Sequence, residues 1–135
     1  MKKLLVLIFF AIVANVISSC SKNISGLSSA QINGTWKLTR ITGGIAGIDS
    51  IPTDDITIAF DLAGKYSTTF NYAITASGTY TLSKAGEPNY YYSDDLVNLT
   101  SNNQTTTYGI VINSDSFVIS QGCCDQFAYS YIRQK

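Results

Sequence analysis

The sequence predicts an all-β domain, a small antiparallel up-and-down β-barrel of about eight strands. Its composition is rich in Tyr, Thr, Ser, Gly and Asn with β-branched residues between them, which is typical of strands and tight turns. Short runs that alternate apolar and polar residues recur along the chain, separated by turn signals. A sheet of this size must hide its edges, and closure into a barrel does so. An open two-sheet sandwich is the alternative architecture.

The chain begins with the pattern of an export signal. Lys2 and Lys3 precede an apolar run at 4–16 that is shorter than a comfortable membrane span. The stretch Ile17-Ser18-Ser19-Cys20 then resembles a bacterial lipobox. We therefore expect residues 1–19 to be a lipoprotein signal peptide, with an ordinary secretory signal as the alternative.

Cys20 is then expected to be the mature N-terminus, carrying a diacylglycerol and a further acyl chain such as palmitate. More than one acyl chain gives stable anchoring, because each buried CH₂ contributes about 0.8 kcal/mol. Residues 20–33 comprise this cysteine and a flexible tether, and residues 34–135 form the barrel domain. Ser21 is not an aspartate, which favours the outer membrane, and the tether lacks the acidic run expected of a surface-exposed lipoprotein. We expect an envelope protein that faces the periplasm.

The expected strands follow one another with short connections. The first runs from about 35 to 42 and carries Trp36, the only tryptophan, on one face with Leu38. A long loop, Gly43–Pro52, follows and contains three isoleucines that could fold over an opening. The later strands are expected at 56–60, 66–74, 80–82 after a turn at Ser77-Gly78, 90–99 as one bulged or two short strands, 106–112, 117–119 and 127–133.

Three features together resemble a known family. Gly34-x-Trp36 opens the first strand, Arg133 lies on the last strand, and the chain ends with Cys123-Cys124-Asp125-x-Phe127-x-Tyr129-x-Tyr131. From about Gly34 to Arg133 the chain is similar to small bacterial lipocalin-like lipoproteins. The resemblance implies that Trp36 packs across the closed end of the barrel and that Arg133 stacks on it, a cation–π contact of about 0.5–2 kcal/mol. The domain is shorter than a typical lipocalin and lacks its C-terminal helix, so the resemblance implies a fold and a plug but no ligand.

Aromatic residues give the candidate binding site. Strand phase is expected to point them into the barrel, where an aromatic cavity with hydroxyl tips would suit a small apolar or amphipathic ligand. The alternative is that they simply fill the barrel as its core. The candidate ligand-binding residues are Phe70, Tyr72, Tyr80, Tyr108 and Tyr129.

Cys123 and Cys124 are adjacent, and an envelope compartment is oxidising. A vicinal disulfide is one interpretation, strained because neighbouring Cα atoms lie about 3.8 Å apart. Two reduced thiols at the last hairpin are the other. Metal binding with Asp125 does not match the usual Cys-x-x-Cys spacing, so no metal is expected.

The remaining composition argues against several functions. The chain has no histidine, and nine basic residues balance nine acidic ones, which is a poor footprint for nucleic acid. No nucleophile–base set or phosphate-binding glycine loop is recognisable, so we expect neither an enzyme nor a cofactor. The primary hypothesis is a non-catalytic barrel, anchored through Cys20, that binds a small hydrophobic ligand. The alternative is a protein-interaction or hydrolase-inhibitor barrel of the bacterial envelope, with an unknown protein partner.

Overall fold

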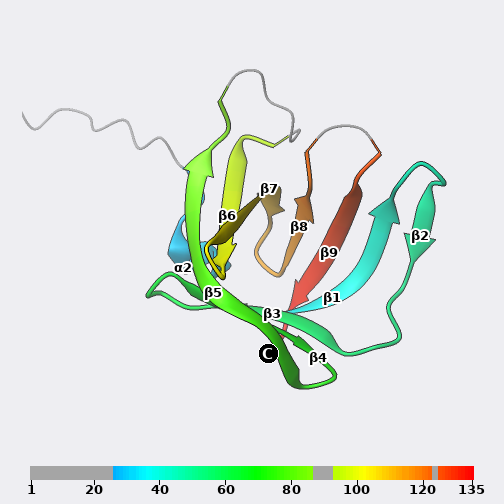
Figure 1. Ribbon diagram of the computed structural model, residues 1–135, viewed down its shortest axis with the longest axis horizontal. Helices are drawn as coiled ribbons and strands as arrows, with labels where there is room; N and C mark the ends of the chain where they lie inside the picture. Colours follow the sequence, from blue (N-terminus) through cyan, green and yellow to red (C-terminus); the bar gives the residue numbers. More distant parts are fainter. Residues whose placement is uncertain (1–25, 87–92, 123–124) are drawn as a thin grey trace, which may run out of the picture.

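The computed structural model describes residues 26–86, 93–122 and 125–135, and it confirms the predicted fold (Figure 1). Eight antiparallel strands close into a barrel, and a ninth, short strand is added to one of them. The elements are α2 (Ser29–Ile32), β1 (Gly34–Gly43), β2 (Ile48–Ser50), β3 (Ile56–Phe60), β4 (Lys65–Phe70), β5 (Ala73–Lys84), β6 (Asp95–Ser101), β7 (Gln104–Ile112), β8 (Ser116–Ser120) and β9 (Phe127–Arg133).

Strand order follows chain order, as expected of an up-and-down barrel. Each strand from β3 to β9 pairs antiparallel with the next, and β9 pairs with β1 to close the sheet. Along its other edge, β1 pairs with β3 through its first half and with β2 through its second half. The barrel strands are therefore β1 and β3–β9, and β2 only extends the edge of β1.

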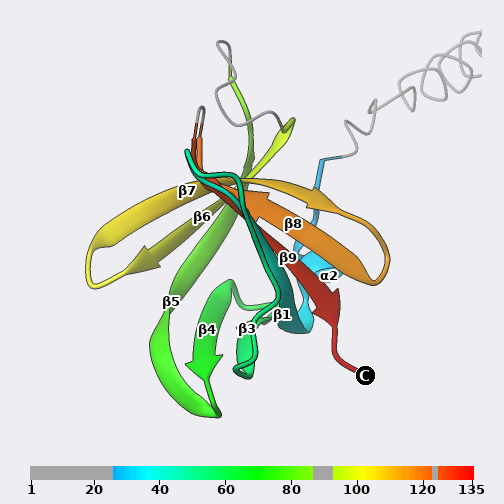
Figure 2. The same ribbon diagram turned by 90° about the vertical axis from the view of Figure 1, so that its right-hand side faces the viewer.

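The connections define two ends of the barrel. The turns β4–β5, β6–β7 and β8–β9 and the loop after β1 lie at one end, which we call the open end. The starts of β1 and β8 and the end of β9 lie at the other, where α2 packs; we call it the closed end. Figure 2 shows the β6–β7 and β4–β5 hairpins diverging from each other toward the open end.

The predicted third strand, 66–74, is wrong at its end. Asn71 and Tyr72 have positive φ values of 48° and 69°, and Phe70 pairs with Ala73, so these residues form a two-residue hairpin turn. Gly78, predicted as a turn, lies inside β5. A Cβ atom at Gly78 would lie 1.9 Å from the Thr100 carbonyl oxygen, so this glycine permits close approach of two strands and does not turn the chain.

The loop Gly43–Pro52 was expected to cover an opening, and that expectation is wrong. Part of it forms β2, which pairs with the end of β1 and lies away from the barrel axis in Figure 1. Ile45 and Ile51 are 89% and 78% exposed, so neither covers the interior. Arg40 and Asp49 form an exposed ion pair that joins the two strands of this hairpin.

Several expectations lie outside the described residues: the signal peptide at 1–19, Cys20 with the first part of the tether, Tyr90–Tyr92, and Cys123 with Cys124. In the part of the chain that the structure describes, no helix is long and hydrophobic enough to span a membrane.

Candidate functional site

The closed end of the barrel is filled by a buried aromatic cluster. Trp36 is completely buried, and its ring contacts Phe117 edge-on with 4.8 Å between ring centroids. Phe117 in turn stacks on Tyr131 at 4.7 Å and meets Phe60 at 6.2 Å. Such ring pairs contribute about 0.5–1.5 kcal/mol beyond the area they bury. We call this layer the floor of the barrel.

Arg133 closes the floor from outside. Its guanidinium carbon lies 3.9 Å from the centre of the Trp36 ring, so the contact expected between these two residues is present. Gly34 makes room for it, since a Cβ there would lie 2.8 Å from an Arg133 nitrogen and the glycine has a φ of 123°. The guanidinium donates to the carbonyl oxygens of Asn33 (2.5 Å) and Gln31 (2.8 Å), which lie in the segment preceding β1.

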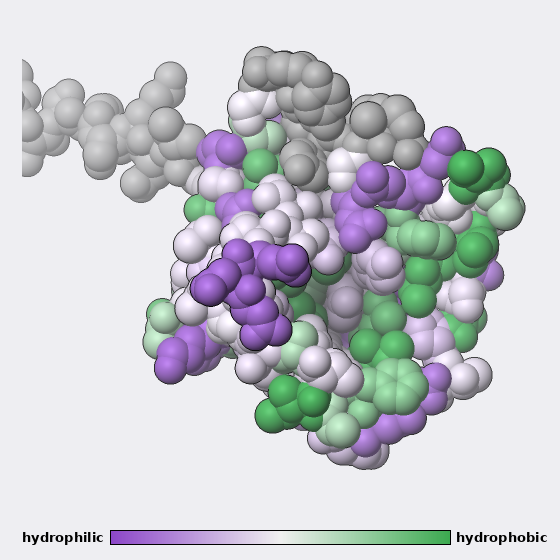
Figure 3. Space-filling view, viewed as in Figure 1, coloured by the Kyte–Doolittle hydropathy of each residue, from purple (hydrophilic) through white to green (hydrophobic). Residues whose placement is uncertain are grey.

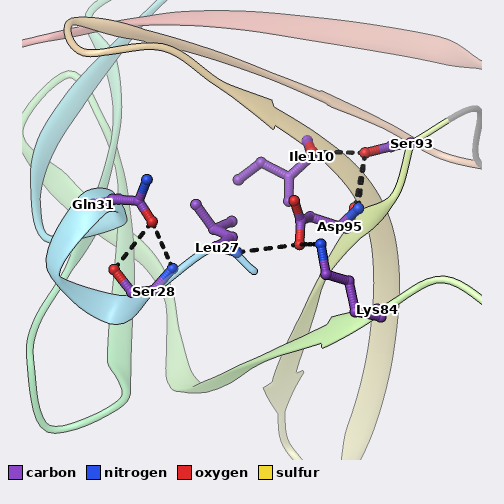
Figure 4. Close-up of polar contacts among 7 residues, drawn as sticks. All are labelled: Leu27, Ser28, Gln31, Lys84, Ser93, Asp95 and Ile110. Atoms are coloured by element: carbon purple, nitrogen blue, oxygen red, sulfur yellow. Dashed lines mark hydrogen bonds and ion pairs between the residues drawn. The ribbon is translucent and has the colours of Figure 1, made fainter. Parts of the chain in front are cut away.

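The segment Leu27–Asn33 forms a stopper under the floor. Ile32 is completely buried, and its carbonyl oxygen accepts a hydrogen bond of 2.7 Å from Trp36 Nε1. Leu27 packs against the same core. Its backbone N–H donates to Asp95 Oδ1 (3.2 Å), which also pairs with Lys84 Nζ (2.8 Å), as Figure 4 shows. Side chains of β5, β6 and β9 therefore hold the N-terminal segment in place.

Above the floor, the inner face of the barrel remains apolar but is only partly buried. Cross-strand pairing places Ile41 beside Tyr129 and Ile56 beside Phe70, so all four share the inward face. Leu99 and Tyr108 continue this face on β6 and β7. We call these six residues the upper wall. All except Phe70 pack against the core while keeping some exposure, and Phe70 at the rim is 44% exposed.

The phenol group of Tyr129 on the upper wall is partly shielded from solvent. Burial raises the pKa of Tyr129, and the neighbouring Tyr108 adds to the shift. Burial also strongly raises the pKa of Tyr131, one layer deeper. These hydroxyls stay protonated at neutral pH, so the wall offers neutral polar groups among apolar ones. That combination suits an uncharged or amphipathic guest.

The structure separates the five predicted ligand-binding residues. Tyr108, Tyr129 and Phe70 come together on the upper wall. Tyr80 faces inward but lies in the floor, almost fully buried, with its hydroxyl donating to the Asp61 carbonyl oxygen at 2.7 Å. The expected inward orientation of Tyr72 is wrong, because it sits in the β4–β5 turn and is 85% exposed.

Sequence reasoning missed the aliphatic part of the wall. The missed residues are Ile41, Ile56 and Leu99. They alternate along their strands in step with the inward-facing aromatic residues, so the same alternation could have identified them. Ile48 is one of the three loop isoleucines that were expected to fold over the opening, and unlike Ile45 and Ile51 it does lie at the rim. It pairs with Gly43, two residues beyond Ile41 on β1, so it lies on the same face at the rim.

Figure 3 shows the face seen in Figure 1 in space-filling form. The molecule is hollowed at the centre of this face, between the side of β5–β7 and the side of β9 and β1. Hydrophobic residues gather along the right-hand and lower margins of the hollow. A sealed floor below a partly exposed apolar wall is an arrangement that can hold a small molecule. Separately, the described residues contain no group of three or more metal-ligating side chains.

Comparisons of the chain with protein-family models, with curated proteins and with solved structures returned no match.

Proposed function

We propose that this protein is a non-catalytic, lipocalin-like barrel that binds a small hydrophobic molecule at its open end. One observation carries the proposal: the inward face is fully packed at the floor but keeps apolar side chains partly exposed above it. An apolar guest would cover Phe70 and its neighbours on the upper wall and remove that surface from water, at about 25 cal/mol per Å². The resemblance to lipocalin-like lipoproteins supports the same proposal.

The test is a fluorescence titration of the full-length chain with an apolar dye, 1-anilinonaphthalene-8-sulfonate, followed by native mass spectrometry for co-purified lipid. Phe70→Ala removes an inward rim side chain, and Tyr72→Ala removes a neighbouring aromatic side chain that faces solvent. We expect Phe70→Ala to weaken dye binding about tenfold, since a buried Phe contributes about 1.5–3 kcal/mol. Tyr72→Ala should bind as the wild type does. Equal affinity in all three, or no saturable binding, would refute the proposal.

Anchorage through Cys20 is part of the proposal and rests on the lipobox-like stretch Ile17–Cys20. In this arrangement two or three acyl chains hold the protein on the periplasmic face of the outer membrane. Cys20→Ser should move the protein from the membrane fraction to the soluble fraction, and mass spectrometry of the wild-type N-terminal peptide should show the acyl mass. An unmodified Cys20 peptide would contradict the anchor while leaving ligand binding open to its own test.

A protein-interaction or inhibitor role is the second candidate, favoured by the exposed isoleucines of the β1–β2 hairpin. Ile45 and Ile51 expose most of their side chains beyond the barrel. Apolar side chains grouped in this way mark contact surfaces more often than isolated ones do. A pull-down from envelope extracts should recover a partner with the wild type and lose it with Ile45→Ser/Ile51→Ser. Recovery of the same proteins by both would count against this role.

A further inference from the structure

Among the described residues, the first half of β7 is paired along one edge only. β7 begins at Gln104, but β8 pairs only with Gly109–Ile112. Within the described residues, Gln104–Tyr108 pairs with β6 alone. Figure 2 shows this part of the β6–β7 hairpin projecting from the barrel with no strand along its other side. An open strand edge of this kind is a template for pairing with another strand.

Turn geometry identifies the backbone groups at this edge. Asn102 and Asn103 have positive φ values, and Ser101 pairs with Gln104, as in a two-residue hairpin whose closing pair exchanges both hydrogen bonds. Because paired residues alternate in an antiparallel ladder, the N–H and C=O groups of Thr105 and Thr107 point away from β6. The backbone groups of Gly109, two residues further along, also point away from β6, and Gly109 pairs with Ser120 of β8.

This edge lacks the usual protection against pairing. The sequence carries no charged residue between Asp95 and Asp115 and no proline in that interval. The β6–β7 ladder has no bulge. Lysines, prolines and bulges are the devices that normally block exposed edges. On the opposite side of the hairpin, by contrast, Ser101 Oγ donates to the Ser77 carbonyl oxygen at 2.9 Å and ties the turn to β5.

A shallow, open polar depression, which we call the slot, lies beside this edge. Its volume is about 540 Å³, and its lining residues are Thr105, Thr106, Thr107, Gln121, Gly122 and Gln126. The slot therefore presents hydroxyl and amide groups without charge. The hairpin turn itself, Ser101–Gln104, has the same uncharged polar character. The edge and slot on one copy are thus chemically matched to the turn on another.

We propose that β7 pairs with β7 of a second copy of this chain, related by a two-fold axis that places Thr105 opposite Thr105. Antiparallel pairing of one edge with itself is isologous, so it closes as a dimer and does not propagate. Each hairpin turn then enters the slot of the other copy. The protein already uses Thr–Thr cross-strand contacts: Thr57 with Thr69 at 2.7 Å and Thr100 with Thr105 at 2.7 Å. No like charges oppose each other in this arrangement.

The first test uses charge complementation in the full-length, detergent-solubilised chain carrying two different affinity tags. Wild-type copies should co-purify. Thr105→Lys alone and Thr105→Glu alone should each reduce co-purification about fivefold, because like charges then face each other directly. Mixing Thr105→Lys with Thr105→Glu should restore it. Thr81→Lys, an exposed substitution on β5, is the matched control and should co-purify as the wild type does. Wild-type copies that stay apart, or Lys and Glu variants that pair as well as the wild type, would overturn the proposal.

The second test traps the contact covalently. Opposed residues of a hydrogen-bonded pair have Cα atoms about 5.5 Å apart, within the range a disulfide spans. In a background with Cys123→Ser and Cys124→Ser, Thr105→Cys should give a disulfide-linked species of twice the monomer mass under mild oxidation in membranes, and Thr81→Cys should not. Thr105→Cys chains linked to a different protein would show that a foreign strand occupies the edge and would overturn self-pairing.

Discussion

Replacement of Trp36 by alanine should strongly destabilise the fold. The side chain is completely buried and contacts Phe117, and replacing a buried large aromatic residue by Ala costs about 3–5 kcal/mol. The variant also removes the donor to the Ile32 carbonyl and the ring beneath Arg133. An unpaired buried polar group costs about 1–3 kcal/mol, but contacts that share one side chain are not additive. We therefore expect a loss of about 4–5 kcal/mol from a total that is typically about 5–15 kcal/mol.

Urea unfolding followed by far-UV circular dichroism measures this loss, because tryptophan fluorescence disappears with the only tryptophan. Trp36→Phe keeps most of the ring but loses the N–H, so its unfolding midpoint should fall between those of wild type and Trp36→Ala. Ile132→Ala is the control: Ile132 lies on β9 near the same end but is half exposed, and surface changes are usually within about 0.5 kcal/mol. A Trp36→Ala midpoint equal to wild type would refute the role of this residue in the floor.

Three further predictions concern other parts of the barrel. Gly78→Ala forces a Cβ against the Thr100 carbonyl and should cost about 1–3 kcal/mol in urea unfolding; an unchanged midpoint would contradict the close strand approach. Arg133→Lys cannot reproduce several hydrogen bonds and the planar stacking at once, so its melting temperature should drop by a few degrees, and a melting temperature at or above that of wild type would argue against the contact. Burial raises the pKa of Tyr131 in the folded state, so its contribution is fully present below the unfolded value of about 10 and is lost as pH rises above it. Tyr131→Phe should flatten this alkaline loss of stability in a pH series of melts, and an identical slope would count against the assignment.

Strand phase predicted most of the barrel. Alternation located β1, β3 and the strands from β7 to β9, because each of these has a side facing the core and a side facing solvent. It failed at Tyr72, since a tyrosine at positive φ is uncommon and gives no turn signal, whereas the residues on either side continue the alternation. Gly78 misled in the opposite direction. A glycine is a typical turn signal, but here it is required because Thr100 of the next strand, β6, approaches closely, and sequence alternation does not show that approach.

For the candidate site, the sequence predicted which side chains face the interior but not how far along the barrel axis each one lies. Phase correctly oriented Tyr80 and Tyr108 toward the interior, yet one lies in the floor and the other on the upper wall. Depth depends on the stagger between strands, which the sequence does not show. The hydrogen bond from the Leu27 N–H to the Asp95 carboxylate could not be predicted from the sequence either. It joins residues 68 positions apart, and its donor is a backbone group that every residue except proline carries.

The stopper beneath the floor has a consequence for how the chain acquires its structure. Arg133, near the C-terminus, binds carbonyl groups 100 and 102 positions earlier, and β9 must pair with β1 before the sheet is closed. Contacts of such long sequence separation slow folding, because the entropy of closing the chain is lost before the contacts form. The floor can therefore be sealed only when the entire polypeptide is present. A chain that ends before β9 would expose the unpaired edges of β1 and β8 and an unanchored N-terminal segment, which makes it a substrate for proteolysis and aggregation.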